Sequence, residues 1–221
     1  MENRLAHIDV KSLQQSLARH LGLYRSKAPY YQATMLNSLL DLWRGPHRRL
    51  LDVGGGTGVI AQAMSEFLPV EDVEAVDLVD RFCSTLSIKT ANYDGHVLPF
   101  ADKAFDAATL NNVLHHVPVE ARADLLREIR RVARGPLYIK DHERRGPIDG
   151  VRLTLLDFIG NVPFGGMLWA RYLSRREWEE TAALAGYRIA ARTSARYRSG
   201  VYALVFPSRL EITMRLEPLD D

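Results

Sequence analysis

A glycine-rich segment carries the clearest chemical signal in this sequence of 221 residues. An apolar run that ends at Val53 predicts a buried strand, and Gly54, Gly56 and Gly58 follow before a helical pattern begins. Glycine permits positive φ and has no Cβ, so the backbone of such a turn can approach a ligand closely. The first N–H groups of the following helix attract a carboxylate or a phosphate because they have no partner within the helix. The segment therefore predicts a site for an anionic ligand group, although a tight strand-to-helix connection alone has the same glycines.

The spacing of the glycines separates the classes of ligand. Dinucleotide-binding turns prefer a third glycine at the position of Val59. No Gly-Lys-Ser/Thr sequence follows, which excludes a phosphate-binding P-loop. Asp77 ends the next predicted strand, 19 residues after Gly58. A carboxylate there can accept both hydroxyl groups of a ribose, so the pattern favours a nucleoside ligand.

Several segments in a fixed order resemble the motifs of class I S-adenosylmethionine-dependent methyltransferases. The glycine-rich segment is similar to the first motif of that family, and Asp77 stands where the family keeps its ribose-binding acid. Asp94 and the Leu-Pro-Phe that follows it are similar to the segment that contacts adenine. The resemblance covers roughly Leu50 to Glu143 and is greatest for the subgroup of quinone-biosynthesis and natural-product methyltransferases. The matching segments are residues 51–58, 93–100, 105–116 and 126–132.

The resemblance implies S-adenosyl-L-methionine as the cofactor and S-adenosyl-L-homocysteine as its product. It implies that Asp52 and the glycine turn meet the methionine end, that Asp77 binds the ribose, and that Asp94 lies beside the adenine amino group. Helix capping is the alternative role for Asp52, and Asp80 competes with Asp77. The implied cofactor-binding residues are Asp52, Gly54, Gly55, Gly56, Gly58, Asp77, Leu78, Asp94, Gly95 and Asn111.

Methyl transfer requires alignment of the acceptor with the sulfur–methyl bond and exclusion of water. A base is needed only when the acceptor carries a proton at the working pH. We predict His115 and then His142 as catalytic residues, because both follow strands whose carboxyl ends form the ligand-binding edge of a parallel sheet. His116 and Asp141 are alternatives, and a structural role is equally open for each histidine. Only one ring of the adjacent His115–His116 pair should face a pocket.

The elements that must position these residues alternate between strands and helices over residues 49–143. This alternation predicts an α/β fold of the Rossmann-like, doubly wound type with a mostly parallel sheet. Only 17 residues separate Asp77 from Asp94, so the helix between those strands should be short or missing. Beyond a helix at residues 175–185, strands at 188–193 and 201–206 should form a C-terminal antiparallel hairpin.

We predict one methyltransferase domain over residues 1–221. Its parts are a helical N-terminal cap (1–49), a cofactor-binding core (50–143), a substrate-cap insertion with one short helix (144–173), a closing helix and hairpin (174–207) and a tail (208–221). The tail could add a strand, dock on a partner or fray. Aromatic residues of the N-terminal cap and the insertion could wall an apolar pocket for a planar acceptor, or join these parts to the core. They are Tyr24, Tyr30, Tyr31, Phe158, Phe164, Trp169 and Tyr172.

The composition is that of an ordinary globular protein, with 47% apolar and 25% charged residues. The sequence has neither a signal-peptide pattern nor an apolar run of the roughly 20 residues that cross a bilayer. The lone Cys83 fits a reducing compartment, so we expect a cytoplasmic protein, and it offers no thiolate pair, so we expect no metal site. A net charge of +2 does not require a polyanionic partner.

These observations predict methyl transfer to a small-molecule acceptor, at a hydroxyl group, in biosynthetic or secondary metabolism. Transfer to nitrogen or carbon remains an alternative, as does an RNA or protein acceptor. Against a macromolecular acceptor, Asn111-Asn112-Val113-Leu114 after the fourth strand lacks the proline and aromatic residues that hold a flipped base or an amide. A non-catalytic S-adenosylmethionine-binding module and a nicotinamide oxidoreductase are further alternatives. We expect no nucleic-acid partner, and a homodimer is one option for the oligomeric state.

Overall fold

A single seven-stranded sheet forms the centre of the molecule. The computed structural model describes residues 7–161, 170–194 and 200–219. The strands lie in the order β3-β2-β1-β4-β5-β7-β6, with β1 to β5 parallel and β7 antiparallel to both of its neighbours. This arrangement confirms the predicted α/β class with a mostly parallel sheet. The strands are β1 (His47–Val53), β2 (Val70–Asp77), β3 (Lys89–Asn92), β4 (Ala107–Asn111), β5 (Leu137–His142), β6 (Tyr187–Thr193) and β7 (Glu211–Pro218).

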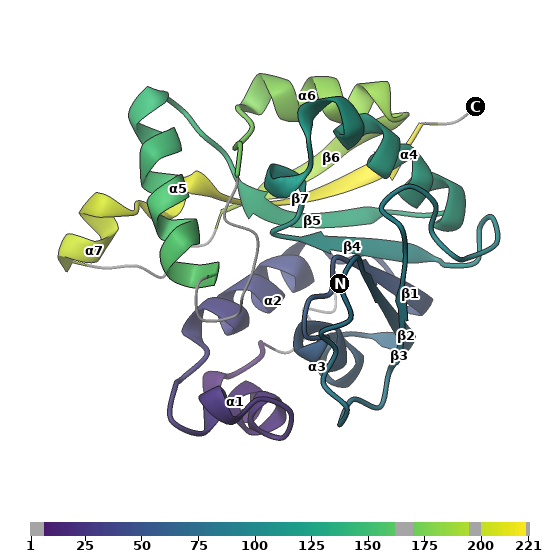
Figure 1. Cartoon of the computed structure of the whole chain (residues 1–221), viewed down its shortest axis with the longest axis horizontal. Coiled ribbons are helices and arrows are strands. Elements are labelled where there is room, and N and C mark those ends of the chain that lie inside the picture. The colour runs from purple at the N-terminus through teal and green to yellow at the C-terminus, as the bar shows by residue number, and fades with distance from the viewer. Residues whose placement is uncertain (1–6, 162–169, 195–199, 220–221) are drawn as a thin grey trace, which may run out of the picture.

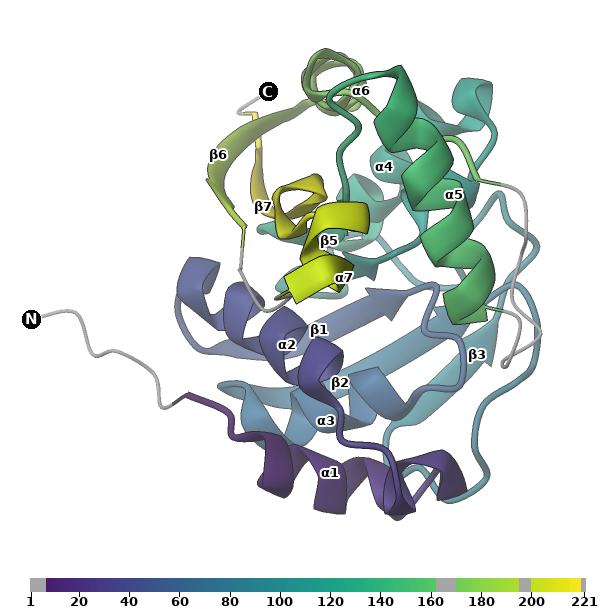
Figure 2. The ribbon, with the colours of Figure 1, turned by 90° about the vertical axis from the view of Figure 1, so that its left-hand side faces the viewer.

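Helices cover both faces of the sheet (Figure 1). On one face lie α1 (Val10–Ala18), α2 (Tyr30–Leu42) and α3 (Val59–Phe67), and Figure 2 shows that they form one layer. On the other face lie α4 (Arg122–Val132) and α6 (Arg175–Leu184), while α5 (Pro147–Asn161) and α7 (Gly200–Val205) stand toward one end of the molecule. None of the described helices is long and apolar enough to cross a membrane.

Successive residues of each central strand enter opposite cores. Leu50 packs with α1, α2 and α3, whereas the adjacent Leu51 packs with α4 and α6, and both are fully buried. Strand side chains alternate between the two faces, and a parallel sheet covered on both sides buries both sets. A strand buried on both faces is therefore expected to have a near-continuous apolar run, as β1, β4 and β5 do.

The closing hairpin differs from the prediction in its second strand. Residues 200–205 form α7 rather than a strand, and the strand that pairs with β6 is β7, within the segment predicted as a tail. A short apolar run such as residues 201–206 does not distinguish helix from strand. The decisive pattern lies in β7, where Ile212, Met214 and Leu216 alternate into the core beside α4 and α6. The hairpin therefore extends to Pro218, and the tail adds a strand.

Two connections show how the core is adapted. Residues 78–88, between β2 and β3, contain no helix, which confirms the expectation from the short spacing between Asp77 and Asp94. The insertion after β5 holds α5, which has 15 residues and is longer than the short helix predicted there.

The turn before β5 depends on a glycine that has no room for a side chain. A Cβ at Gly135 would lie 2.2 Å from the carbonyl oxygen of Asp106, which is a backbone atom that cannot rotate away. We expect Gly135→Ala to lower the free energy of unfolding by about 1–3 kcal/mol, the usual cost of overpacking. Urea unfolding followed by circular dichroism measures this change. Gly22→Ala is the matched control, because a Cβ there would meet nothing within 4 Å, and an equal loss in both variants would contradict the prediction.

Candidate functional site

The turn between β1 and α3 combines glycines that the fold requires with one that faces open space. Gly54, Gly56 and Gly58 have φ values of +74°, +59° and +77°. A Cβ at Gly54 would lie 2.4 Å from Val113 Cγ2, and a Cβ at Gly58 would lie 2.4 Å from Leu86 Cδ1. A Cβ at Gly56 would meet nothing within 4 Å. Packing therefore accounts for the absent side chain at two of these glycines, whereas at Gly56 the bare backbone is left open to a ligand.

A cavity of about 340 Å³ lies over this turn. Its walls come from the glycine turn, the end of β2, the exit of β4 and the N-terminal cap. Of the predicted cofactor-binding residues, the cavity is lined by Asp52, Gly54, Gly55, Gly56, Asp77, Leu78 and Asn111. Its other lining residues are Leu21, Tyr24, Tyr31, Gln32, Met35, Thr57, Val59, Ile60, Arg81, Tyr93, Asn112, Val113, His116 and Val117. The carboxyl ends of the parallel strands thus face one hollow, as expected for this class of sheet.

Asp52 is a buried carboxyl group held at the floor of the cavity. Its Oδ1 accepts hydrogen bonds from the Thr109 hydroxyl at 2.7 Å and from Asn111 Nδ2 at 3.1 Å. Burial raises the pKa of Asp52 to about 7, against the lowering effect of these two bonds, and the nearby charge of Asp77 raises it further. No side chain caps α3, so helix capping is not the role of Asp52 here. A buried acid of this kind can accept a cationic group from a ligand.

Asp77 ties the end of β2 to the glycine turn. Its Oδ2 accepts the Gly56 N–H at 2.7 Å, and its Oδ1 accepts the Val79 N–H at 3.1 Å. Arg81 NH2 lies 3.6 Å from Oδ1. The competing acid, Asp80, is exposed and does not line the cavity. Asp77, and not Asp80, is thus the acid that lies beside the cavity at the carboxyl ends of the parallel strands.

Asp94 and Gly95 lie outside the cavity wall. The Asp94 carboxylate accepts the backbone N–H groups of His96 and Val97 at 2.8 and 2.9 Å, and these bonds lower its pKa. Gly58 likewise does not line the cavity. Tyr93 lines it in this region and belongs to the segment that resembles the adenine-contacting motif, but it was not among the predicted cofactor-binding residues. A role for Asp94 beside adenine therefore stays a prediction.

A chain of buried polar groups supports the cavity from the side of the N-terminal cap. The Tyr31 hydroxyl lies 2.8 Å from Asn112 Nδ2 and 3.0 Å from Lys140 Nζ. Lys140 pairs with Glu211 at 2.7 Å, with both side chains buried. Burial alone would lower the pKa of Lys140, but Glu211 and Tyr31 raise it above its ordinary value, so the lysine stays charged. Asn112 adopts φ +56°, which asparagine tolerates better than most residues.

This network of hydrogen-bonded side chains was not predicted, although the sequence contains a signal for it. Lys140 interrupts the otherwise apolar start of β5, and a lysine in a fully covered strand needs a buried partner. Its partner, Glu211, lies in β7, within the tail for which a strand was one of three predicted possibilities.

The two predicted catalytic histidines do not line the cavity. His115 is fully buried and His142 is 8% exposed, whereas His116 lines the cavity. Residues 114–116 form a 3₁₀ turn, in which successive side chains project about 120° apart. The expectation that one ring of the adjacent pair faces the pocket is met, but by the other histidine. The candidate base therefore moves from His115 and His142 to His116.

The aromatic residues selected from the sequence have different environments. Tyr24 and Tyr31 line the cavity, whereas Tyr30 is 65% exposed. Tyr172 stacks on His115 with ring centroids 4.8 Å apart. Phe164, Trp169 and the side chain of Phe158 lie outside the described residues. Of the aromatic residues selected from the sequence, the two that line the cavity thus come from the N-terminal cap.

Comparisons with known proteins identify the class of enzyme. Residues 51–136 match the family model of a methyltransferase domain. An uncharacterized methyltransferase of Mycolicibacterium paratuberculosis is 29% identical over 182 residues, which cover 72% of this chain and 70% of that protein. One of Mycobacterium avium is 32% identical over 146 residues, covering 60% of this chain and 55% of that protein.

Solved structures show the same fold at low sequence identity. A putative methyltransferase from Bacillus halodurans has a TM-score of 0.61 at 16% identity and covers 87% of this chain and 99% of that one. A SAM-dependent methyltransferase from Methanosarcina mazei has a TM-score of 0.62 at 15% identity, with 83% and 98% covered. Residues 51–136 therefore form a methyltransferase domain, and the chain is a methyltransferase.

The raised pKa of Asp52 predicts a pH dependence of stability. Between about pH 4 and about pH 7 the unfolded carboxyl group is ionised while the folded one keeps its proton. The contribution of Asp52 to the free energy of unfolding therefore falls as the pH rises through this window and is constant above it. Because Asp52→Asn cannot ionise, we expect its stability relative to the wild type to rise from pH 5 to pH 7.5. Urea unfolding at several pH values measures it.

Asp106→Asn is the control, because the pKa of Asp106 is shifted in the opposite direction from that of Asp52. Burial alone would raise the pKa of Asp106, but the backbone N–H of Arg49 and the Arg134 guanidinium hold it below its ordinary value. Its stabilisation is present above the unfolded pKa, so the effect of Asp106→Asn should be constant from pH 5 to pH 7.5. A constant difference for Asp52→Asn as well would mean that Asp52 is ionised throughout, contrary to the prediction.

Proposed function

We propose that this methyltransferase uses S-adenosylmethionine to methylate a hydroxyl group of a small molecule. The observation that carries the proposal is the shared cavity, in which the glycine turn and Asp77 lie opposite His116 and the N-terminal cap. One hollow of about 340 Å³ suits a cofactor and a small acceptor in contact. A histidine at its wall can take the proton that a hydroxyl acceptor must lose.

The residues of the cavity fit the cofactor. We infer that Asp52 receives the amino group of its methionine part, because this buried acid accepts hydrogen bonds from the uncharged side chains of Thr109 and Asn111 and could accept a further one from a cationic group. The open backbone at Gly56 allows the close approach that a nucleoside needs. Asp77 would hold the ribose hydroxyls, and Leu78 and Tyr93 would pack against the adenine ring. When bound, S-adenosylmethionine supplies a methyl carbon that is activated by a positively charged sulfur atom.

The acceptor would lie between the N-terminal cap and the exit of β4. This wall is largely apolar, with Leu21, Tyr24 and Met35 on the cap side and Val113 and Val117 opposite. Such a lining suits a planar, mostly apolar molecule with one reactive hydroxyl group. It agrees with the resemblance to quinone-biosynthesis and natural-product methyltransferases. We include the insertion at 144–173 among the segments that select the acceptor, within one domain formed by the whole chain.

His116 would act as the general base. A ring nitrogen of His116 would take the hydroxyl proton of the acceptor, and the bound cofactor would supply the methyl group that replaces that proton on the oxygen. The chain's other task is to hold the acceptor in line and keep water out. The linked side chains of Tyr31, Asn112 and Lys140 stiffen the wall that does this.

Loss of the Asp77 carboxylate should weaken cofactor binding. We expect Asp77→Ala to reduce the affinity for S-adenosylhomocysteine by about 1–3 kcal/mol, the cost of lost hydrogen bonds to a charged group. Isothermal titration calorimetry measures it, with NAD as a second titrant. Asp80→Ala is the matched control, since that acid is exposed three residues later. Equal affinities in both variants would refute the ribose role, and tight NAD binding alone would favour an oxidoreductase.

Removal of the His116 ring should slow the reaction without affecting cofactor binding. For hydroxyl acceptors we expect His116→Gln to lower kcat by about 10²–10⁴-fold, the usual contribution of a general base. A panel of phenols, amines and activated carbon acids, with release of S-adenosylhomocysteine as the readout, measures this effect. His96→Gln is the control at an exposed histidine.

The panel also distinguishes the alternatives. Turnover of amines with no response to His116→Gln would favour nitrogen methylation. Cofactor binding without turnover of any member, together with salt-sensitive RNA binding, would favour a macromolecular acceptor.

A further inference from the structure

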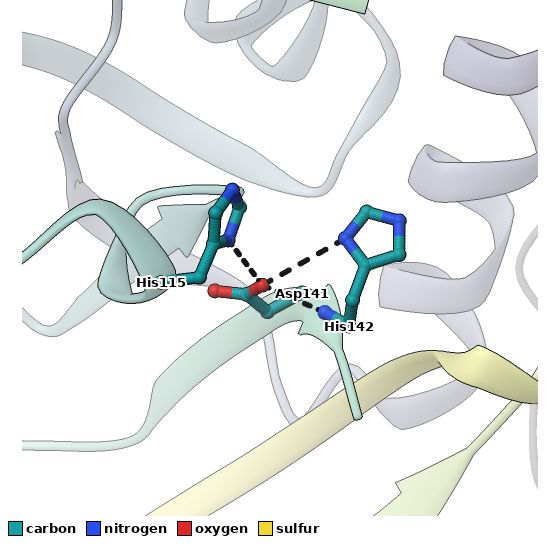
Figure 3. A group of neighbouring side chains, drawn as sticks. All are labelled: His115, Asp141 and His142. Atoms are coloured by element: carbon teal, nitrogen blue, oxygen red, sulfur yellow. Dashed lines mark hydrogen bonds and ion pairs between the residues drawn. The ribbon is translucent and has the colours of Figure 1, made fainter. Parts of the chain in front are cut away.

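Three side chains that the proposed reaction does not use converge on one another (Figure 3), and none of them lines the cavity. His115 lies in the 3₁₀ turn Leu114–His116 that follows β4, and Asp141 and His142 end β5. Asp141 Oδ1 lies 2.5 Å from His115 Nδ1 and 3.8 Å from His142 Nδ1. One ligand atom from each residue lies within 4.8 Å of the other two. Two imidazole rings therefore face one carboxylate from two neighbouring strand ends.

The cluster is buried, and polar atoms of two of its residues, Asp141 and His142, have no hydrogen-bond partner among the described residues. His115 and Asp141 are fully buried, and His142 is 8% exposed. Among the described residues, neither ring nitrogen of His142 has a hydrogen-bond partner, and neither does Asp141 Oδ2. Such atoms are rare in native proteins because each costs about 1–3 kcal/mol. Their presence at one point indicates a bound partner that supplies the missing bonds, such as an ion.

The donor set is that of a transition-metal site. Two imidazoles and one carboxylate bind Zn²⁺ in catalytic and other open sites, and imidazole also suits Fe²⁺, Ni²⁺ and Cu²⁺. Ligand atoms around one zinc ion stand about 3–4 Å apart, since each lies about 2.0–2.2 Å from the metal. The present separations are 2.5 Å and 3.8 Å for two of the pairs, and every pair is within 4.8 Å, so they lie on both sides of this range. Small rotations of the rings and the carboxylate would bring all three atoms to one ion.

We propose that His115, Asp141 and His142 bind one divalent transition-metal ion, and that zinc is the ion that the site fits best. Binding of the ion releases the proton that His115 Nδ1 shares with Asp141 Oδ1 and replaces their hydrogen bond with two metal–ligand bonds. It also gives His142 Nδ1, which lies 3.8 Å from Asp141 Oδ1, a direct bond. The ion lies outside the cavity, because neither His115 nor His142 lines the cavity. Its role is therefore to hold structure and not to contact the acceptor.

The site's position explains what the ion would hold. It joins the exit of β4 to the end of β5, and the His115 ring packs on Tyr172, near the start of α6. The next residue along the chain is His116, whose ring centroid lies 4.2 Å from that of His115. Binding of the ion thus fixes the 3₁₀ turn that carries the candidate base.

Titration of the metal-free protein with zinc tests the site without cofactor or acceptor. Tag-free full-length protein, stripped with a chelator and dialysed, is titrated with ZnCl₂ by calorimetry. We expect one equivalent to bind and the melting temperature to rise. Titration with CoCl₂ should give visible absorption bands of a nitrogen- and oxygen-ligated ion. Absence of both stoichiometric zinc binding and a cobalt spectrum would overturn the proposal, whatever the methyltransferase assays give.

His142→Gln and His47→Gln form a matched pair of variants. Both histidines are 8% exposed, but His47 Nε2 lies 3.1 Å from the Tyr138 hydroxyl and far from the cluster in the fold. We expect His142→Gln to weaken zinc binding at least 10–100-fold, the effect of losing even an outer partner, and His47→Gln to leave it unchanged. Equal zinc affinities would refute the site. If His142→Gln does not fold, the zinc affinity of Asp141→Asn and the cobalt spectrum of the wild type replace it. Weakened zinc binding and a cobalt spectrum would support the site, and unchanged binding without a spectrum would refute it.

Discussion

The hydrogen bond from the Gly56 N–H to the Asp77 carboxylate is the contact on which the rest of the site depends. It joins the turn after β1 to the end of β2, so the two parts of the proposed cofactor site are positioned by each other before any ligand arrives. This hydrogen bond therefore fixes the conformation of the glycine turn, the open space above Gly56 and the orientation of Asp77 together. Because the protein itself holds this geometry, a cofactor would find a largely preformed turn, with less conformational freedom to lose on binding.

Charged groups buried in the sheet serve a different purpose. Lys140 and Glu211 lie on adjacent strands under α2, and Tyr31 connects them to Asn112 at the cavity. A buried ion pair contributes little net stability, because desolvation offsets the attraction, but breaking it leaves an uncompensated charge. The pair therefore favours one position of α2 over others. It connects the part of the chain that would select the acceptor to the part that would bind the cofactor.

The sequence predicted the sheet, the glycine turn and Asp77 because each depends on local pattern, such as alternating strands and helices and the spacing of glycines. It failed where the answer depended on contacts between distant segments. The choice between His115 and His116 follows from the 3₁₀ geometry of residues 114–116, which no spacing rule predicted. The apolar run at 201–206 fits a strand as well as α7, and β7 was decided by its partner β5. The partners of Lys140 likewise come from residues more than 60 positions away.

The placement of β7 has a consequence for the order in which the chain folds during synthesis. It is the last of the seven strands along the chain, yet it lies between β5 and β6 and contacts α2, which is made early. While the ribosome is still producing residues 211–218, β6 has no neighbour in the sheet, and part of α2 has no strand to cover. Part of α2 and the edge of β5 therefore stay exposed until residues 211–218 have been made. Such an exposed edge is a natural place for a chaperone to bind, or for two nascent chains to pair wrongly.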